Sequence, residues 1–269
     1  MTSTVSELLR ITKDLFDYCL REEPDLEILS GQRCSDKLGQ QVYIKVVYNI
    51  ILELAPDSLL MIEKKRYVSS ATLLRSLFEY YIELLFLAKH PENYKQRGLD
   101  AKRGQQKILN TIETSPEPCL AKLKTDSRFE PKKDELSNDL NGYSEKRLLD
   151  ICNELGLNWM YNTVYRCLSP VAHPSLINYE NRYFEADPSG KMIKYDPAPQ
   201  LNEETAIERL VLLSNILVGS TECIHHTLPN CNASVIDAQL EKFVSEMKKA
   251  TPSLAEDTPA DEDEPKKDH

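Results

Sequence analysis

The sequence is poor in glycine and lacks any long hydrophobic run. Only 8 of its 269 residues are glycine, which argues against an architecture rich in tight turns and against glycine-lined phosphate loops. The longest apolar runs, such as residues 84–88, are far shorter than the roughly 20 residues that span a bilayer. The N-terminal region carries Glu7 and Asp14 and lacks the basic head and apolar block of a secretion signal. We therefore expect a cytoplasmic protein without a membrane span.

The familiar signatures of metal and nucleophile sites are also missing. The seven cysteines are scattered and form no Cys-x-x-Cys pair, so reduced thiols that serve in packing are the simplest interpretation. The sequence has no Gly-x-Ser-x-Gly and no His-Glu-x-x-His motif. Cys223, His226 and Cys231 could approach one another at a helix end, but their spacing matches no zinc signature. We expect no metal and no cofactor.

Positive charge is scarce relative to negative charge. The net charge is −10, and residues 251–269 contribute −5 of it through seven acidic residues and two lysines. This acidic segment has almost nothing to bury, so we expect it to be a disordered tail. The overall sign does not suggest nucleic-acid binding, which needs clustered Lys and Arg, but it leaves room for a local basic patch.

Apolar residues recur mainly at helical spacing, which predicts an all-α fold. We expect a single domain over residues 1–250, built as a multi-helix bundle with a small β-hairpin insertion over 181–196. Pro56 and Asp57 are expected to separate the second helix from the third. The predicted helices are 3–21, 37–54, 57–90, 93–114, 144–155, 202–227 and 233–250, with a further helix that begins at Asn158.

Residues 91–142 differ in character from the rest of the domain. They are polar and contain three prolines after Pro91, which indicates a mobile or loosely packed insert. The basic residues here are interpreted as a solvated face that Glu92 and Asp100 offset, with a phosphate-binding stripe as the alternative. They are Lys95, Arg97, Lys102, Arg103 and Lys107.

The stretch 161–175 is the most informative for function. It begins as a helix, and Pro170 and Pro174 are expected to stop it. At its end it presents Arg166, Ser169 and His173, and the last carbonyls of a helix need polar partners.

A second polar pair lies in the apolar helix before it. Arg75 and Glu79 are at i and i+4, on one helix face, and charges in so apolar a setting must be paired. One interpretation is a buried structural ion pair, with His173 capping its own helix end and bonding Glu79 or Ser169. The alternative is that Arg75, Glu79, Arg166 and His173 converge in one pocket.

Two segments together resemble a known family. Residues 67–79, with the Arg-x-x-x-Glu pair, and the run Tyr165-Arg166-Cys167-Leu168-Ser169-x-x-x-His173-Pro174 are similar to domain-of-unknown-function family 5677, a largely microbial group of helical proteins. The resemblance covers about residues 42–224. It implies a helical fold and no particular function.

A looser similarity links Arg166 and His173, which six residues separate, to the Arg-x(4–6)-His motif of the HEPN superfamily (higher eukaryotes and prokaryotes nucleotide-binding). Cys167 stands where that motif often has Asn, Asp or His. The resemblance implies an all-helical homodimer and a metal-independent ribonuclease. His173 would then transfer a proton, and Arg166 would hold the phosphate.

Two functions follow as hypotheses. The first is a HEPN-like RNA-handling protein, a metal-independent endoribonuclease of a stress or antiviral defence system, with Arg166 and His173 catalytic. Arg75, Glu79, Tyr165 and Ser169 would form its pocket. The second is a non-catalytic helical module that binds a protein partner or a small ligand.

Overall fold

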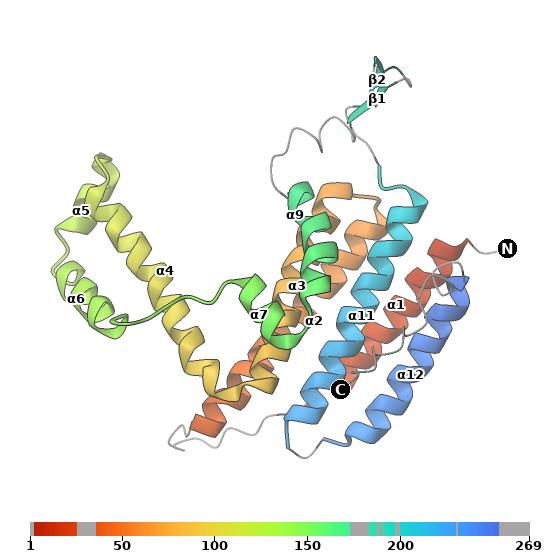
Figure 1. The fold of residues 1–269 in the computed structure, drawn as a ribbon, viewed down its shortest axis with the longest axis horizontal. Coiled ribbons are helices and arrows are strands. Elements are labelled where there is room, and N and C mark those ends of the chain that lie inside the picture. Colours follow the sequence, from red (N-terminus) through yellow and green to blue (C-terminus); the bar gives the residue numbers. More distant parts are fainter. Residues whose placement is uncertain are drawn as a thin grey trace, which may run out of the picture.

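The computed structural model describes residues 3–25, 36–172, 183–186, 189, 191–196, 200–229 and 231–252. His173 lies outside these residues, and so do residues 253–269 of the acidic segment expected to be disordered. Within them the structure confirms the all-α fold with its small hairpin (Figure 1). The elements are α1 Thr4–Arg21, α2 Asp36–Glu63, α3 Tyr67–Lys89, the 3₁₀ turn η1 Pro91–Asn93, α4 Tyr94–Thr114, α5 Pro118–Lys124, α6 Phe129–Asp139, α7 Leu148–Leu155, α8 Asn158–Met160, the π-helical turn η2 Tyr161–Tyr165, α9 Arg166–Ala172, β1 Phe184–Ala186, β2 Met192–Tyr195, α11 Glu203–Thr227 and α12 Ala233–Ala250.

Helix α11 is the centre of the bundle, because α1, α2, α3 and α12 all pack against it (Figure 1). Its neighbours bury large side chains such as Tyr48 and Phe78 completely. Some polar groups in this core are paired, such as the hydroxyl groups of Tyr48 and Thr221, which lie 3.0 Å apart. Gly219 is needed where α11 crosses α3, since a Cβ there would lie 2.5 Å from the Tyr81 hydroxyl. The core is therefore largely apolar and closely packed.

The expected break at Pro56 is wrong. Helix α2 continues through Pro56 to Glu63, because the proline is exposed while Ala55 and Leu59 on the same helix are buried in the core. The chain turns instead at Lys64–Arg66, where Lys65 adopts a left-handed conformation with φ of 53°. The free energy gained by packing the apolar face of α2 thus outweighs the cost of the one helical hydrogen bond that Pro56 cannot donate.

Helices α4, α5 and α6 form an arm beside the bundle (Figure 1). Helix α4 has no fully buried residue, and α6 packs on it through Phe129 and Leu136. The segment 115–142 is therefore largely helical, although its composition indicated few packing groups.

The predicted hairpin is confirmed. Strands β1 and β2 pair antiparallel, with Phe184 opposite Tyr195, and these two rings lie 5.2 Å apart. Within the described ranges, every helix is too short or too polar to traverse a lipid bilayer.

Candidate functional site

Helix α9 and the turn before it lie against α3 and bring the two sequence motifs together (Figure 1). Leu168 is buried, and the Tyr165 ring lies 6.0 Å from that of Phe78 on α3. The Tyr165 hydroxyl accepts a hydrogen bond of 2.7 Å from Arg75 Nη2. Arg75 Nε in turn lies 3.2 Å from Glu79 Oε1.

This pairing is less buried than the sequence indicated. The side chain of Arg75 is 20% exposed and that of Glu79 is 42% exposed, so the pair lies at the surface of the bundle. The pKa of Tyr165 is raised, because burial of the phenol outweighs the opposing effect of Arg75. Tyr165 therefore stays neutral and holds Arg75 in place as an acceptor.

A π-helical turn, Tyr161–Tyr165, precedes α9. The backbone N–H of Arg166 donates to the Tyr161 carbonyl, five residues earlier, which aligns these two residues along the helix. The Arg166 guanidinium lies 5.9 Å from the centre of the Tyr161 ring, and the rings of Tyr161 and Tyr165 stack at 5.0 Å. We call Arg75, Glu79, Tyr161, Tyr165 and Arg166 the Tyr–Arg cluster.

The other predicted site residues stand as follows. Arg166 is exposed, whereas Ser169 is half-buried on the next turn of α9 and makes no hydrogen bond to the cluster within the described part of the chain. His173 lies outside the described residues. The expected stop at Pro170 is wrong, because α9 runs through it to Ala172.

Tyr161 was missed as a site residue. The only signal for it in the sequence is the Tyr-x-x-x-Tyr spacing of Tyr161 and Tyr165, which places two rings on one face of a helix.

Four of the five basic residues of α4 singled out above lie beside carboxylates, and Lys95 is one of them, 2.6 Å from Asp36. Lys102 lies 2.6 Å from Asp139, and Lys107 lies 3.3 Å from Glu145. Arg97 is largely buried and lies 2.6 Å from both Glu83 and Asp100. The interpretation of these basic residues as a solvated face is therefore wrong for Arg97, whose ion pair with Glu83 links α4 to α3.

A comparison with models of protein families finds a family to which the chain is similar. A family model described as "Family of unknown function (DUF5677)" matches residues 41–192. The chain belongs to this family. The match runs from within α2 to the first residue of β2 and includes both motifs, but it ends before α11 and so falls short of the expected limit near residue 224. No curated protein and no solved structure matches the chain.

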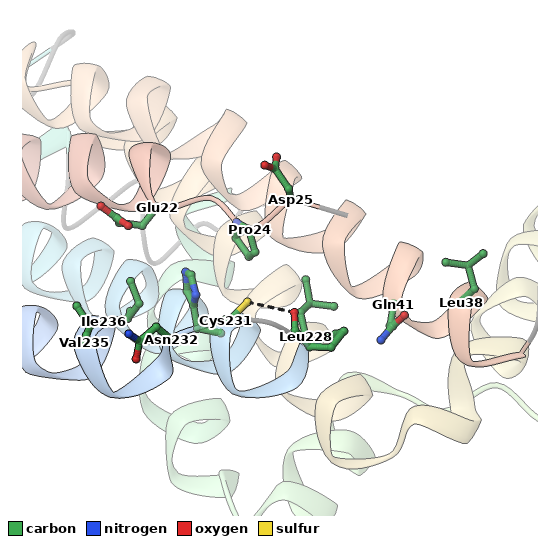
Figure 2. Close-up of a pocket in the computed structure, with 12 residues that line it drawn as sticks. Glu22, Pro24, Asp25, Leu38, Gln41, Leu228, Cys231, Asn232, Val235 and Ile236 are labelled. Atoms are coloured by element: carbon green, nitrogen blue, oxygen red, sulfur yellow. Dashed lines mark hydrogen bonds between the residues drawn. The ribbon is translucent and has the colours of Figure 1, made fainter. Parts of the chain in front are cut away.

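A second candidate site is a cavity of about 550 Å³. Most of the residues that line it lie outside the range that matches DUF5677. It lies between the C-terminal ends of α1 and α11 and the first turns of α2 and α12 (Figure 2). His225 lines it and is only 7% exposed, and neither ring nitrogen makes a hydrogen bond of normal geometry within the described residues. Burial lowers the pKa of His225, although the Glu22 backbone carbonyl acts in the opposite direction. A neutral imidazole therefore faces this cavity.

The expectation that the cysteines serve in packing holds for only part of the described set, since Cys19 and Cys152 are buried whereas Cys119 and Cys167 are exposed. Burial raises the pKa of Cys19 to about 12 and that of Cys223 to about 11. Cys231 is half-exposed, and its Sγ donates to the Pro229 carbonyl. Among the described residues, no cysteine belongs to a group of candidate metal ligands.

Proposed function

We propose that this protein handles RNA in the manner of the HEPN superfamily, as a metal-independent ribonuclease in which Arg166 holds a phosphate and His173 transfers a proton. The observation that carries the proposal is the exposed Arg166 guanidinium. It lies against the Tyr161 ring and has no carboxylate partner among the described residues. Its N–H donors therefore remain available for a phosphate, which an arginine can bind through two hydrogen bonds.

The rest of the Tyr–Arg cluster supports the same function. Single-stranded RNA is bound by aromatic rings and guanidinium planes that stack on bases, next to cations that contact the backbone. The cluster has two stacked tyrosines, and Arg75 and Arg166 lie over their rings at 5.0 and 5.9 Å. Glu79 holds Arg75 from the next turn of α3.

The spacing of the motif supplies the proton-transfer group. His173 follows Arg166 by seven residues, about two helical turns, and this spacing returns to the same helix face. Histidine is the side chain best suited to proton transfer near neutral pH. His173 lies outside the described residues, so its role rests on this spacing.

We also propose a cytoplasmic homodimer. Six described cysteines are free, in keeping with a reducing compartment. The HEPN similarity implies the dimer, and light scattering after size-exclusion chromatography tests it.

The test of the activity is incubation of purified protein with mixed RNA in the presence of EDTA. We expect the wild type to cut the RNA and Arg166→Ala and His173→Ala to lose the activity. Arg21→Ala is the matched control, because Arg21 is also exposed at a helix end and lies 5.3 Å from a tyrosine ring, that of Tyr18. Intact RNA with the wild type, or equal cleavage by all three variants, would refute the proposal.

The second candidate function is a non-catalytic module that binds a small ligand. The cavity beside His225 favours it, because its volume lies within the range of small-molecule sites and neither ring nitrogen of the imidazole makes a hydrogen bond of normal geometry among the described residues. A thermal-shift screen of small molecules tests it, with His225→Phe as the variant that should lose any shift. A shift that persists in this variant would place the ligand elsewhere.

A further inference from the structure

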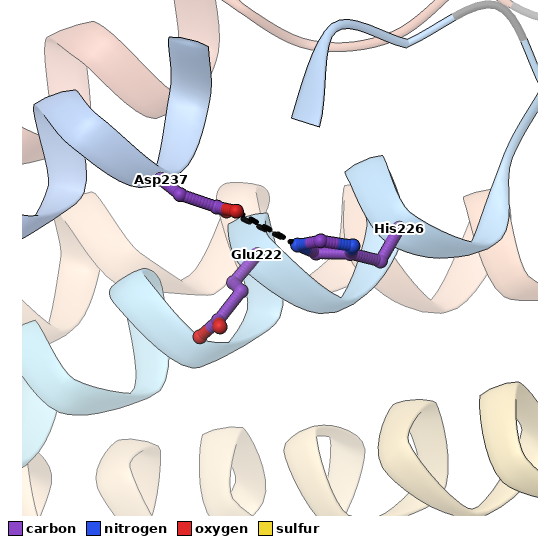
Figure 3. Close-up of side chains that lie close together, drawn as sticks. All are labelled: Glu222, His226 and Asp237. Carbon is purple, nitrogen blue, oxygen red and sulfur yellow. Dashed lines mark hydrogen bonds and ion pairs between the residues drawn. The ribbon is translucent and has the colours of Figure 1, made fainter. Parts of the chain in front are cut away.

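The ends of α11 and α12 bring together a histidine and two carboxylates. His226 Nε2 lies 3.2 and 3.0 Å from the two carboxylate oxygens of Asp237, which is on α12 (Figure 3). Glu222 lies one turn before His226 on the same face of α11. Each of the three residues offers one ligand atom, and these atoms all lie within 4.8 Å of one another.

These donors suit a divalent transition-metal ion. Imidazole nitrogen and carboxylate oxygen bind Zn²⁺ at about 2.0–2.2 Å, so ligands of one ion lie roughly 3–4 Å apart. Glu222 and His226 are exposed, so small side-chain rotations can bring their atoms to that separation. The two carboxylates also balance the charge of a divalent cation.

The surroundings favour a cation as well. His226 belongs to the last turn of α11, where the helix dipole attracts positive charge. A groove of about 490 Å³ borders the cluster, and Glu222, Asp237 and Glu241 all line it, together with Lys248. The groove leaves room for water, or for a ligand, on the metal positions that the protein does not fill.

We propose that Glu222, His226 and Asp237 form a metal site that binds Zn²⁺ with three protein ligands and at least one open position. The ion would replace the hydrogen bond between His226 and Asp237 and would link α11 to α12. The sequence drew attention to Cys223, His226 and Cys231, but the fold provides carboxylates in place of the thiols. The site is separate from the Tyr–Arg cluster, because α12 lies across α11 from α9 (Figure 1).

Isothermal titration calorimetry of metal-free, tag-free protein with Zn²⁺ tests the proposal. We expect one ion per chain for the wild type. Loss of a residue that only supports a metal ligand weakens binding about 10–100-fold, so His226→Ala and Glu222→Gln, which remove a ligand, should weaken it by at least about 100-fold. The matched control is Glu208→Gln, which makes the same change at an exposed position nearer the start of α11, and it should bind like the wild type.

Titration with Co²⁺ identifies the ligands, because thiolate ligation adds an intense charge-transfer band that nitrogen and oxygen ligands lack. We expect the wild type to show no such band. Circular dichroism of the metal-free variants should match the wild type, since the mutated side chains are exposed, and thermal unfolding of metal-free Glu222→Gln, which leaves the His226–Asp237 contact in place, should match it too. Absence of binding at millimolar Zn²⁺, equal binding by His226→Ala, or a thiolate band at one equivalent of Co²⁺ would each overturn the proposal.

Discussion

Replacement of Arg97 by alanine should destabilise the protein by about 3–5 kcal/mol, the typical cost of breaking a buried ion pair by removing one partner. The side chain of Arg97 is 10% exposed and that of Glu83 is 18% exposed, and the two groups lie 2.6 Å apart. Without the guanidinium, Glu83 would keep its charge in the contact between α3 and α4 with no cation to offset the lost hydration. The full range applies because neither group reaches water well enough to recover its solvation.

The same change should alter how stability depends on pH. Burial already raises the pKa of Glu83 against the opposing pull of Arg97, and loss of Arg97 should raise it further. The folded state then binds a proton more readily than the unfolded state, so the free energy of unfolding falls as pH rises above the unfolded value of about 4.3. Each further pKa unit adds about 1.4 kcal/mol to this dependence. The variant should therefore lose more stability at about pH 7.5 than at about pH 5.

Urea unfolding at these two pH values measures both effects. Lys107→Ala is the matched control, because Lys107 also forms an ion pair from α4, with Glu145, but both side chains are more than half exposed. Its cost should be at most about 1 kcal/mol. If Arg97→Ala costs no more than Lys107→Ala, or if its cost is the same at both pH values, the inference that Arg97 and Glu83 form a buried ion pair is refuted.

Three further substitutions test the site and the fold by the same assay. Tyr165→Phe removes the hydroxyl that accepts from Arg75 and should cost about 1 kcal/mol. Tyr161→Phe should cost nothing measurable, since this hydroxyl makes no hydrogen bond among the described residues, and an equal cost for the two would argue against the Arg75 bond. Pro56→Ala should stabilise the protein by about 2 kcal/mol, because alanine restores a helical N–H at an exposed position of α2. A loss of stability would show that the proline ring is needed there.

The sequence predicts a helix well where the spacing of its apolar residues and a capping side chain indicate the same starting point. Helix α1 has both, since Ser3 accepts from the Ser6 N–H at its start. Helix α11 is similar, because the Asn202 side chain accepts from the Thr205 N–H. The Arg75–Glu79 pair could also be predicted, because i and i+4 on one helix are neighbours in any tertiary context.

The end of α2 could not be predicted in this way. The Arg66 N–H donates to the Met61 carbonyl and the Lys65 N–H to the Ile62 carbonyl, the pattern that usually has glycine in the left-handed position. Here Lys65 takes that position, so the turn has neither glycine nor proline to mark it. The burial of Arg97 could not be predicted for a related reason. Its main partner, Glu83, lies on another helix, and the sequence does not show which face of α4 meets α3.

The Tyr–Arg cluster depends on a backbone register that residue identities do not reveal. In a regular α-helix each residue advances about 100°, so Tyr161 and Arg166, five residues apart, would point about 140° away from each other. The π-helical turn adds one residue to the ring closed by the Arg166 N–H and the Tyr161 carbonyl, which brings both side chains to one face. Tyr165 remains fixed to α3 by Phe78 and Arg75, so the turn carries Arg166 into the same cluster. An RNA-binding role for Arg166 within this cluster therefore requires the π-helical turn as well as the motif. Regular α-helical spacing can be used only for the residues that follow this turn, from Arg166 onward.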